Sequence, residues 1–174
     1  MKTEIITKTP KDFIQDIYFH NLGKILTELN STYISFAMMA IGIEFLGKCL
    51  DTSEQDWHAY RPGLPDFHFR KAISELHSFR LYRKYLKKEK LFDAFRNGFA
   101  HSLIPKKPIL LTDGRPDKHL EYKDGVLTLN CESMYNDFIK ACDDLFLLME
   151  EPNKFASNDK IFQPVLMIRR EIPD

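Results

Sequence analysis

The stretch Tyr33–Leu50, with the sequence YISFAMMAIGIEFLGKCL, decides the fold. It is apolar nearly all round until Glu44 and Lys48, which predicts a buried helix at the centre of a helical bundle. Its uncharged part, residues 31–43, is shorter than the roughly 20 residues that cross a bilayer, so we expect no membrane span. Small residues along it would let neighbouring helices approach closely: Ala37, Ala40, Gly42 and Gly47.

Helical patterns flank this stretch on both sides. The segment Thr9-Pro10-Lys11-Asp12 has the cap, proline and carboxylate of a helix start, and apolar residues follow at three- and four-residue steps as far as Leu29. A loop punctuated by prolines and glycine is expected over residues 51–65. Further helices are predicted over residues 66–88 (bent near His77-Ser78), 89–103 and 130–149. Together they predict a mainly α, up-and-down helical bundle.

The pattern changes between the last two predicted helices. Residues 109–112, 120–122 and 126–129 form short β-like runs, and Asp124-Gly125 is typical of a tight hairpin turn. We therefore expect a small antiparallel flap inserted at about residues 109–129 into a single domain that spans residues 1–174.

The composition is that of a globular protein. Lys+Arg and Asp+Glu both number 25, so the formal charge is zero, which argues against a simple basic nucleic-acid binder. The three cysteines, at positions 49, 131 and 142, match no metal-ligand spacing and fit a reducing compartment. With no apolar leader at the N-terminus, we expect a cytoplasmic protein that needs no metal or other cofactor.

The segment Arg96-Asn97-Gly98-Phe99-Ala100-His101 contains the candidate catalytic residues. An arginine can hold phosphate oxygens in two-pronged geometry, and a histidine can move a proton near neutral pH. Asn97 and His101, four residues apart, share a helix face, so Asn97 is expected to orient the imidazole. Arg96 lies about 140° away and must reach round or act with a second copy. Spacing alone favours a simpler interpretation, a helix end with a capping histidine and a solvated arginine.

The segment from Phe95 to His101 resembles the signature of the HEPN superfamily, in which an arginine and a polar residue precede a histidine. This resemblance implies a helical bundle with metal-independent endoribonuclease activity, in which two copies place their motifs across a shared cleft. By position, it makes Arg96 the phosphate clamp, His101 the acid/base and Asn97 the orienting amide. Toxins of one branch often carry a modified tyrosine where this chain has Leu103, so that form of regulation is not expected.

The resemblance therefore implies a toxin or an antiviral defence enzyme that acts on RNA as a homodimer, with a cognate antitoxin protein as a possible partner. The alternative is a catalytically inactive HEPN-like module that binds a nucleotide or a protein partner. The enzyme predicts that Arg96 and His101 are exposed together in a basic cleft near a two-fold axis. The inactive module allows either residue to be buried or paired with a carboxylate.

Basic residues precede the motif at helical spacing, with tyrosines between them. Such a stripe suits an RNA backbone, with the tyrosines free to stack on bases, but it also suits a solvated helix face. Both interpretations remain open for these residues: Arg80, Arg83, Lys84, Lys87, Lys88, Tyr82 and Tyr85.

Two further groups of residues have functional side chains. The loop residues Trp57, His58 and Tyr60 could close over a base, although a loop tryptophan is more often fixed in the core. Metal-capable side chains without a tight ligand spacing predict no metal site: Asp66, His68, Glu75 and His77.

Overall fold

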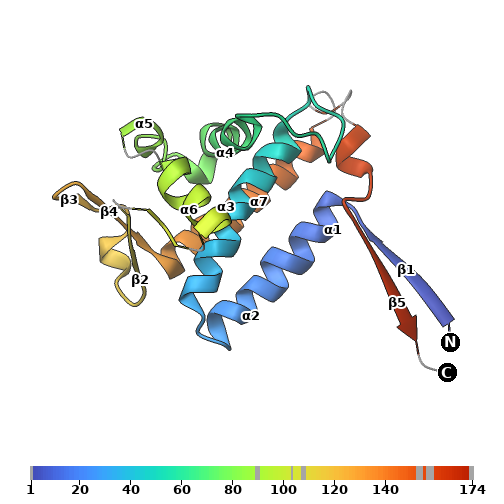
Figure 1. Cartoon of the computed structure of the whole chain (residues 1–174), viewed down its shortest axis with the longest axis horizontal. Coiled ribbons are helices and arrows are strands. Elements are labelled where there is room, and N and C mark those ends of the chain that lie inside the picture. The colour runs from blue at the N-terminus through green and yellow to red at the C-terminus, as the bar shows by residue number, and fades with distance from the viewer. Residues whose placement is uncertain are drawn as a thin grey trace.

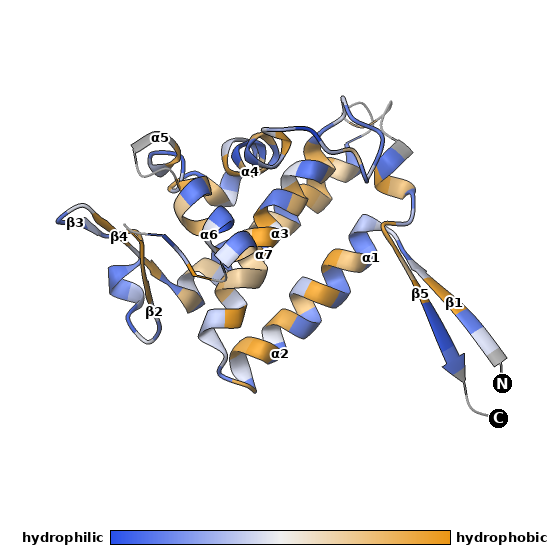
Figure 2. Cartoon of the chain, in the orientation of Figure 1, coloured by the Kyte–Doolittle hydropathy of each residue, from blue (hydrophilic) through white to orange (hydrophobic). Residues whose placement is uncertain are grey.

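The apolar helix expected at the centre of the fold is α3 (Thr32–Leu50). The computed structural model describes residues 2–88, 91–102, 104–106, 109–151, 155 and 159–172. Figure 2 shows α3 apolar along most of its length, whereas α1 and α2 alternate apolar and polar residues. By length and composition α3 could cross a membrane, but 56% of its most apolar window is buried in the fold, as in the core helix of a soluble protein.

One helical segment precedes α3, and its start is confirmed. The Thr9 side chain accepts from the Asp12 N–H and the Asp12 carboxylate accepts from the Thr9 N–H, which is a capping box with Pro10 in the first turn. The segment has three consecutive parts: α1 (Pro10–Ile14), the π-helix η1 (Gln15–Asn21) and α2 (Leu22–Thr27). It runs beside α3, which buries its apolar face (Figure 1).

The helix expected over residues 66–88 is shorter than predicted. The α4 helix ends at Glu75, where Leu76 has extended backbone with ψ of 129°, and residues 80–84 form turns. The bend expected near His77-Ser78 is present as a short 3-10 helix. The remaining helical elements are α4 (Leu64–Glu75), η2 (His77–Phe79), α5 (Tyr85–Lys88), the π-helix η3 (Phe92–Arg96), α6 (Asn97–Ser102) and α7 (Cys131–Glu150).

The β insertion is a mixed sheet, so the expectation of a wholly antiparallel flap is wrong. The short strand β3 (Tyr122–Lys123) is antiparallel to β4 (Val126–Asn130), and Asp124 and Gly125 between them have the positive φ values of 51° and 76°. However, β2 (Ile109–Thr112) runs parallel to β4. The reason is that the segment containing η4 (Pro116–Lys118) returns the chain before β3 begins.

A second pair of strands joins the two ends of the described chain. The β1 strand (Lys2–Lys8) pairs antiparallel with β5 (Leu166–Ile172), which follows the 3-10 helix η5 (Asp159–Phe162). Figure 1 shows this ribbon extending away from the helices. It was not predicted, because neither strand has a local partner that a sequence pattern could indicate.

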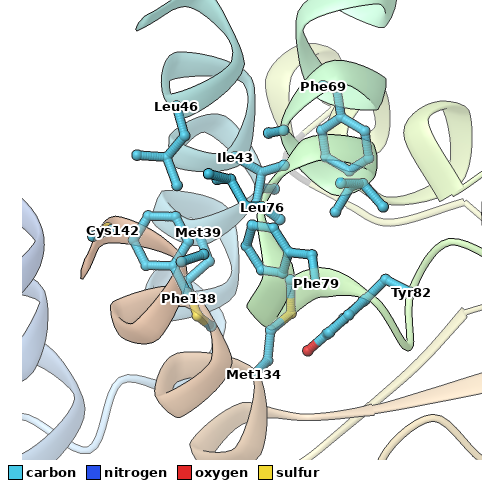
Figure 3. Close-up of a cluster of buried hydrophobic side chains, with 14 of the residues drawn as sticks. Met39, Ile43, Leu46, Phe69, Leu76, Phe79, Tyr82, Met134, Phe138 and Cys142 are labelled. Atoms are coloured by element: carbon cyan, nitrogen blue, oxygen red, sulfur yellow. The ribbon is translucent and has the colours of Figure 1, made fainter. Parts of the chain in front are cut away.

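Aromatic and aliphatic side chains from α3, α4 and α7 form the core (Figure 3). Phe36, Met39 and Phe138 are fully buried, and the Phe138 ring meets the ring of Tyr18 edge-on at 5.0 Å between centroids. The mainly α class is therefore confirmed, with two small sheets added at its edges.

A buried hydrogen-bond network attaches the β insertion to the helices. The Asn130 N–H donates to Nδ1 of His119 at 3.1 Å, so the ring proton lies on Nε2, which is 2.8 Å from the Tyr82 hydroxyl. That hydroxyl donates to Asp137 on α7 at 3.0 Å. Burial, with Asp137 beside it, raises the pKa of Tyr82 well above its ordinary value, so the phenol stays protonated.

The helices α3 and α4 make a very close contact at Gly47. A Cβ atom placed on Gly47 would come 1.7 Å from the His68 carbonyl oxygen, so only glycine permits this approach. By comparison, a Cβ on Gly23 in α2 would meet only the end of a flexible side chain, the Tyr135 hydroxyl, at 2.9 Å.

We predict that Gly47→Ala lowers the free energy of unfolding by about 2–3 kcal/mol, because the backbones of α3 and α4 must separate. Gly23→Ala is the matched control and is expected to be neutral or slightly stabilising, because alanine favours a helix. Urea unfolding followed by circular dichroism measures both. Equal effects of the two substitutions would contradict the close α3–α4 contact.

Candidate active site

The segment with the arginine and histidine is held against α3 by its aromatic residues. Phe95 and Phe99 are fully buried. The ring of Phe95 packs edge-on against Phe36 at 6.0 Å, and that of Phe99 packs against Tyr33 at 5.2 Å. These contacts fix the junction of η3 and α6 on the central helix, so the polar residues between them have a defined position.

The backbone before the motif is a π-helix, which the sequence did not indicate. The Asn97 N–H donates to the Phe92 carbonyl, five residues earlier in the chain. Isolated π turns of this kind occur often at functional sites. The wider turn ends at Arg96, so the α-helical spacing from Asn97 to His101 still holds.

Arg96 is mostly buried and paired with Glu44 of α3. Its Nε forms an ion pair with Glu44 Oε2, and the two side chains are 14% and 19% exposed. Neither of these two atoms makes a well-aligned hydrogen bond within the described residues. The guanidinium carbon also lies 5.5 Å from the centre of the Phe92 ring. The charge of Arg96 is therefore balanced within the fold.

Asn97 positions the arginine, so the expectation that it orients His101 is wrong. Its Oδ1 accepts from Nη1 of Arg96 at 3.0 Å, and its Nδ2 donates to Asp93 Oδ1 at 3.3 Å. Both ends of the amide are occupied in this way. Arg96 is thus held from two sides, by Glu44 and by Asn97.

His101 is exposed in the last turn of α6 and has no hydrogen bond to any residue that the structure describes. The nearby Gly98 has a structural explanation. A Cβ on Gly98 would lie 2.6 Å from the Ile104 carbonyl oxygen and 2.8 Å from the Cα of Pro105. The glycine therefore allows the following backbone to approach the helix.

Arg96, Asn97 and His101 line one pocket of about 250 Å³, as the catalytic interpretation requires. We call this the motif pocket. The charge around it differs from expectation, because Asp66 lies in its wall and Glu44 neutralises Arg96. The pocket is therefore not strongly basic. Its other walls come from Tyr60, Gly63, Pro65 and Phe92.

The two tyrosines expected to stack on RNA bases are buried, so that prediction is wrong. Tyr82 is fully buried and Tyr85 is 5% exposed. The Tyr82 hydroxyl belongs to the His119–Asp137 network, and the Tyr85 hydroxyl donates to the Leu120 carbonyl at 2.6 Å. They point inward because residues 80–84 form turns instead of the helix on which the expected stripe was drawn.

The basic residues of the expected RNA track do not form a helical stripe. Arg83 donates to the Ile73 and Leu76 carbonyls at the end of α4, at 3.2 and 3.4 Å. Arg80 bonds to His77 through its guanidinium at 2.7 Å, and Lys84 is exposed with its ammonium 4.8 Å from the Tyr85 ring centre. The side chains of Lys87 and Lys88, like Leu103, lie outside what the structure describes.

Sequence reasoning missed two residues that hold the motif in place, Glu44 and Asp93, and only Glu44 could have been recognised from the sequence. Glu44 is a carboxylate in an apolar helix, and a buried carboxylate requires a cationic partner. Asp93, which holds Asn97, had no such signal. In the loop, Trp57 is fixed as expected: its ring stacks on Phe45 at 5.8 Å and its Nε1–H donates to the Lys160 carbonyl at 3.1 Å.

A buried histidine–carboxylate pair lies near the motif pocket. His68 Nε2 is 3.1 Å from Asp51 Oδ2, with both side chains almost completely buried. Burial lowers the pKa of His68, against the opposing effect of Asp51. Burial by itself would raise the pKa of Asp51, but hydrogen bonds from Ser53 and His68 outweigh it and lower that pKa. The folded protein therefore favours a neutral His68 beside an ionised Asp51.

No family model, curated protein or solved structure matches this chain. The resemblance to the HEPN superfamily consequently rests on the sequence motif and stays a prediction.

We predict that Glu44→Gln lowers the free energy of unfolding by about 1–3 kcal/mol, because it leaves the mostly buried Arg96 without a counter-charge. The matched control is Glu75→Gln, which breaks the more exposed Lys71–Glu75 pair within α4 and should cost less than about 0.5 kcal/mol. Chemical denaturation measures both. Similar losses for the two variants would contradict the importance of the Glu44–Arg96 pair.

His68 should make stability depend on pH. The pKa of His68 is lower in the folded than in the unfolded chain. Its contribution to the free energy of unfolding is therefore complete above the unfolded pKa, near 6.5, and is lost as the pH falls through the folded pKa. We therefore expect the free energy of unfolding to fall below pH 6.5, and to fall less in His68→Gln. Urea titrations between pH 7.5 and 5 test this. If the free energy of unfolding falls with pH as steeply in His68→Gln as in the parent, this expectation is wrong.

Proposed function

We propose that this chain is a HEPN-like, metal-independent endoribonuclease built as an up-and-down helical bundle and acting in the cytoplasm as a homodimer. The observation that supports it best is that Arg96, Asn97 and His101 line one pocket. The sequence has two other arginine–histidine pairs, Arg61–His68 and Arg70–His77, each seven residues apart. One member of each has another partner, since His68 is buried against Asp51 and Arg70 donates to Asp66. A toxin or antiviral defence role, with a cognate antitoxin as partner, belongs to the same proposal.

The proposed reaction is cleavage of RNA by its own ribose. The 2′-oxygen attacks the adjacent phosphorus, the bond from phosphorus to the 5′-oxygen breaks, and the products carry a 2′,3′-cyclic phosphate and a 5′-hydroxyl. His101 accepts the proton of the 2′-hydroxyl as general base. Arg96, held by Asn97 and Glu44, places its remaining guanidinium hydrogens against the phosphate oxygens, where negative charge develops.

The leaving 5′-oxygen needs a proton from a second group, which we assign to a second copy of His101. An exposed apolar stripe on α3 offers a surface for that copy. Ile34 and Ile41 lie two helical turns apart on the same face, at 49% and 47% exposed. Glu44 follows Ile41 within one turn and pairs with Arg96, which lines the motif pocket, so a partner on this stripe would lie near that pocket.

One observation favours the alternative, a catalytically inactive module that binds a nucleotide or a protein partner. Arg96 is paired with a carboxylate and is mostly buried, whereas a phosphate clamp is expected to be free. In this alternative the arginine has a structural role, and ligands would be bound without being cleaved.

The nuclease proposal predicts that the purified protein cleaves RNA in the presence of EDTA. Arg96→Ala and His101→Ala should each lower the rate about 100-fold or more, because each removes a group that acts in the transition state. A mixed pool of RNA oligonucleotides is the substrate, and mass spectrometry should find cyclic phosphate ends. Sedimentation velocity on the same sample reports whether the protein is a dimer.

The control is His20→Ala, because His20 is an exposed histidine on η1 that does not line the motif pocket. This variant should cleave as fast as the parent. If His101→Ala also retains full activity, the mechanism is wrong. If no protein cleaves RNA, while the parent binds a nucleotide, the inactive module is the correct function.

A further inference from the structure

A second compartment of about 280 Å³ adjoins the motif pocket. The two share three lining residues, Tyr60, Pro65 and Arg96. Arg96 is thus common to both, with His101 in the motif pocket and Lys48 and His58 in the second compartment. Their combined size falls in the range of ligand-binding sites, which is about 300–1,000 Å³.

Tyr60 is placed to act as a stacking surface for both compartments. It is 82% exposed, the highest value among the large apolar side chains that the structure describes, and its ring makes no contact with another ring there. The loop around it is nevertheless fixed. Trp57 is held by Phe45 and Lys160, and the Leu64 N–H donates to the Arg61 carbonyl at 3.1 Å. Because the loop is already anchored, covering this exposed ring with a planar ligand costs little backbone entropy.

The polar groups of the second compartment suit a nucleobase better than a phosphate alone. Glu44 contributes a carboxylate acceptor, while Lys48 and His58 contribute donors. Base edges carry donors and acceptors side by side and can use both kinds of group. A second phosphate would instead be repelled by Glu44. Leu64, Pro65 and Ala59 complete the wall with apolar surface.

We infer that the second compartment binds one nucleoside of an RNA strand, with the base stacked on Tyr60 and the adjoining phosphate at Arg96. This inference rests on the proposed function and adds a substrate subsite to it. The following nucleoside then occupies the motif pocket beside His101. A dinucleoside monophosphate is consequently the smallest ligand that fills the site.

The test uses adenylyl-3′,5′-adenosine with a 2′-O-methyl group on its first ribose, which cannot be cleaved. Titration into ¹⁵N-labelled full-length protein should shift the amide signals of residues 58–60 together with those of residues 96–101. Inorganic phosphate alone should shift only the latter. Loss of base stacking in Tyr60→Ala should weaken binding about 5- to 150-fold.

Two variants serve as controls. Tyr60→Phe keeps the ring and should bind within about 3-fold of the parent, as judged by the same stacking argument. Phe162→Ala removes another exposed ring, 68% exposed, that lines neither compartment and should have no effect. Equal affinity of Tyr60→Ala and the parent, or shifts that avoid residues 58–60, would overturn the subsite.

The experiments can reject the nucleoside subsite and the nuclease function independently of each other. If the dinucleotide binds as expected but RNA is not cleaved, the subsite stands and the proposed nuclease function fails. If RNA is cleaved and Tyr60→Ala changes neither the KM of cleavage nor the affinity for the dinucleotide, the nuclease stands and the subsite is wrong.

Discussion

The ion pair between Glu44 and Arg96 is the constraint on which the site depends. Glu44 interrupts the apolar central helix at a position that the fold largely withdraws from water, so its charge must be compensated. The compensating arginine comes from a segment about fifty residues later, and Phe95 and Phe99 on either side pack against the same helix. The charge of Glu44 and the two aromatic contacts together fix where the motif lies on α3.

The same pair determines which guanidinium hydrogens of Arg96 remain available to a phosphate. A phosphate at Arg96 does not need to displace Glu44, because the ion pair uses Nε and the bond to Asn97 uses one hydrogen of Nη1. The guanidinium has five N–H donors in a planar fork, so hydrogens on Nη1 and Nη2 remain. Glu44 and Asn97 together restrict the rotation of the side chain, which reduces the entropy lost on binding. The nearby carboxylate also weakens the attraction of the site for anions, so the proposed binding of RNA would have to draw on contacts to the base as well.

The sequence predicted those parts of the fold that depend on local patterns. The long apolar run predicted α3, and the cap, proline and carboxylate at Thr9–Asp12 predicted the start of α1. The predicted start of the last helix at residue 130 is confirmed, since Asn130 caps α7 by accepting from the Ser133 N–H. Pairings between distant segments were missed, because no local signal specifies them. Lys2 pairs with Ile172 across nearly the whole chain, and β2 reaches β4 by a crossover.

For the site, residue types were easier to predict than contacts. Arg96, Asn97 and His101 do share a pocket, and Asn97 and His101 lie in one regular helix as assumed, but the Asn97 amide bonds to Arg96 and Asp93 instead of His101. The basic stripe failed for a different reason. Extended backbone at Leu76 ends α4, so the helical spacing that aligned Tyr82 and Tyr85 with the cations no longer held, and both rings entered the core.

The exposure of His101 follows from how the chain leaves α6. The Lys106 N–H donates to the Ala94 carbonyl at 2.8 Å and the Ile104 N–H to the Gly98 carbonyl at 3.3 Å, so the backbone turns back along the helix that it has just left. This return needs the space above Gly98 that a side chain would fill. Because the chain folds back there, the helix ends one residue after His101, and the imidazole stays open to the motif pocket. The glycine between the arginine and the histidine therefore lets the anchored helix leave His101 uncovered.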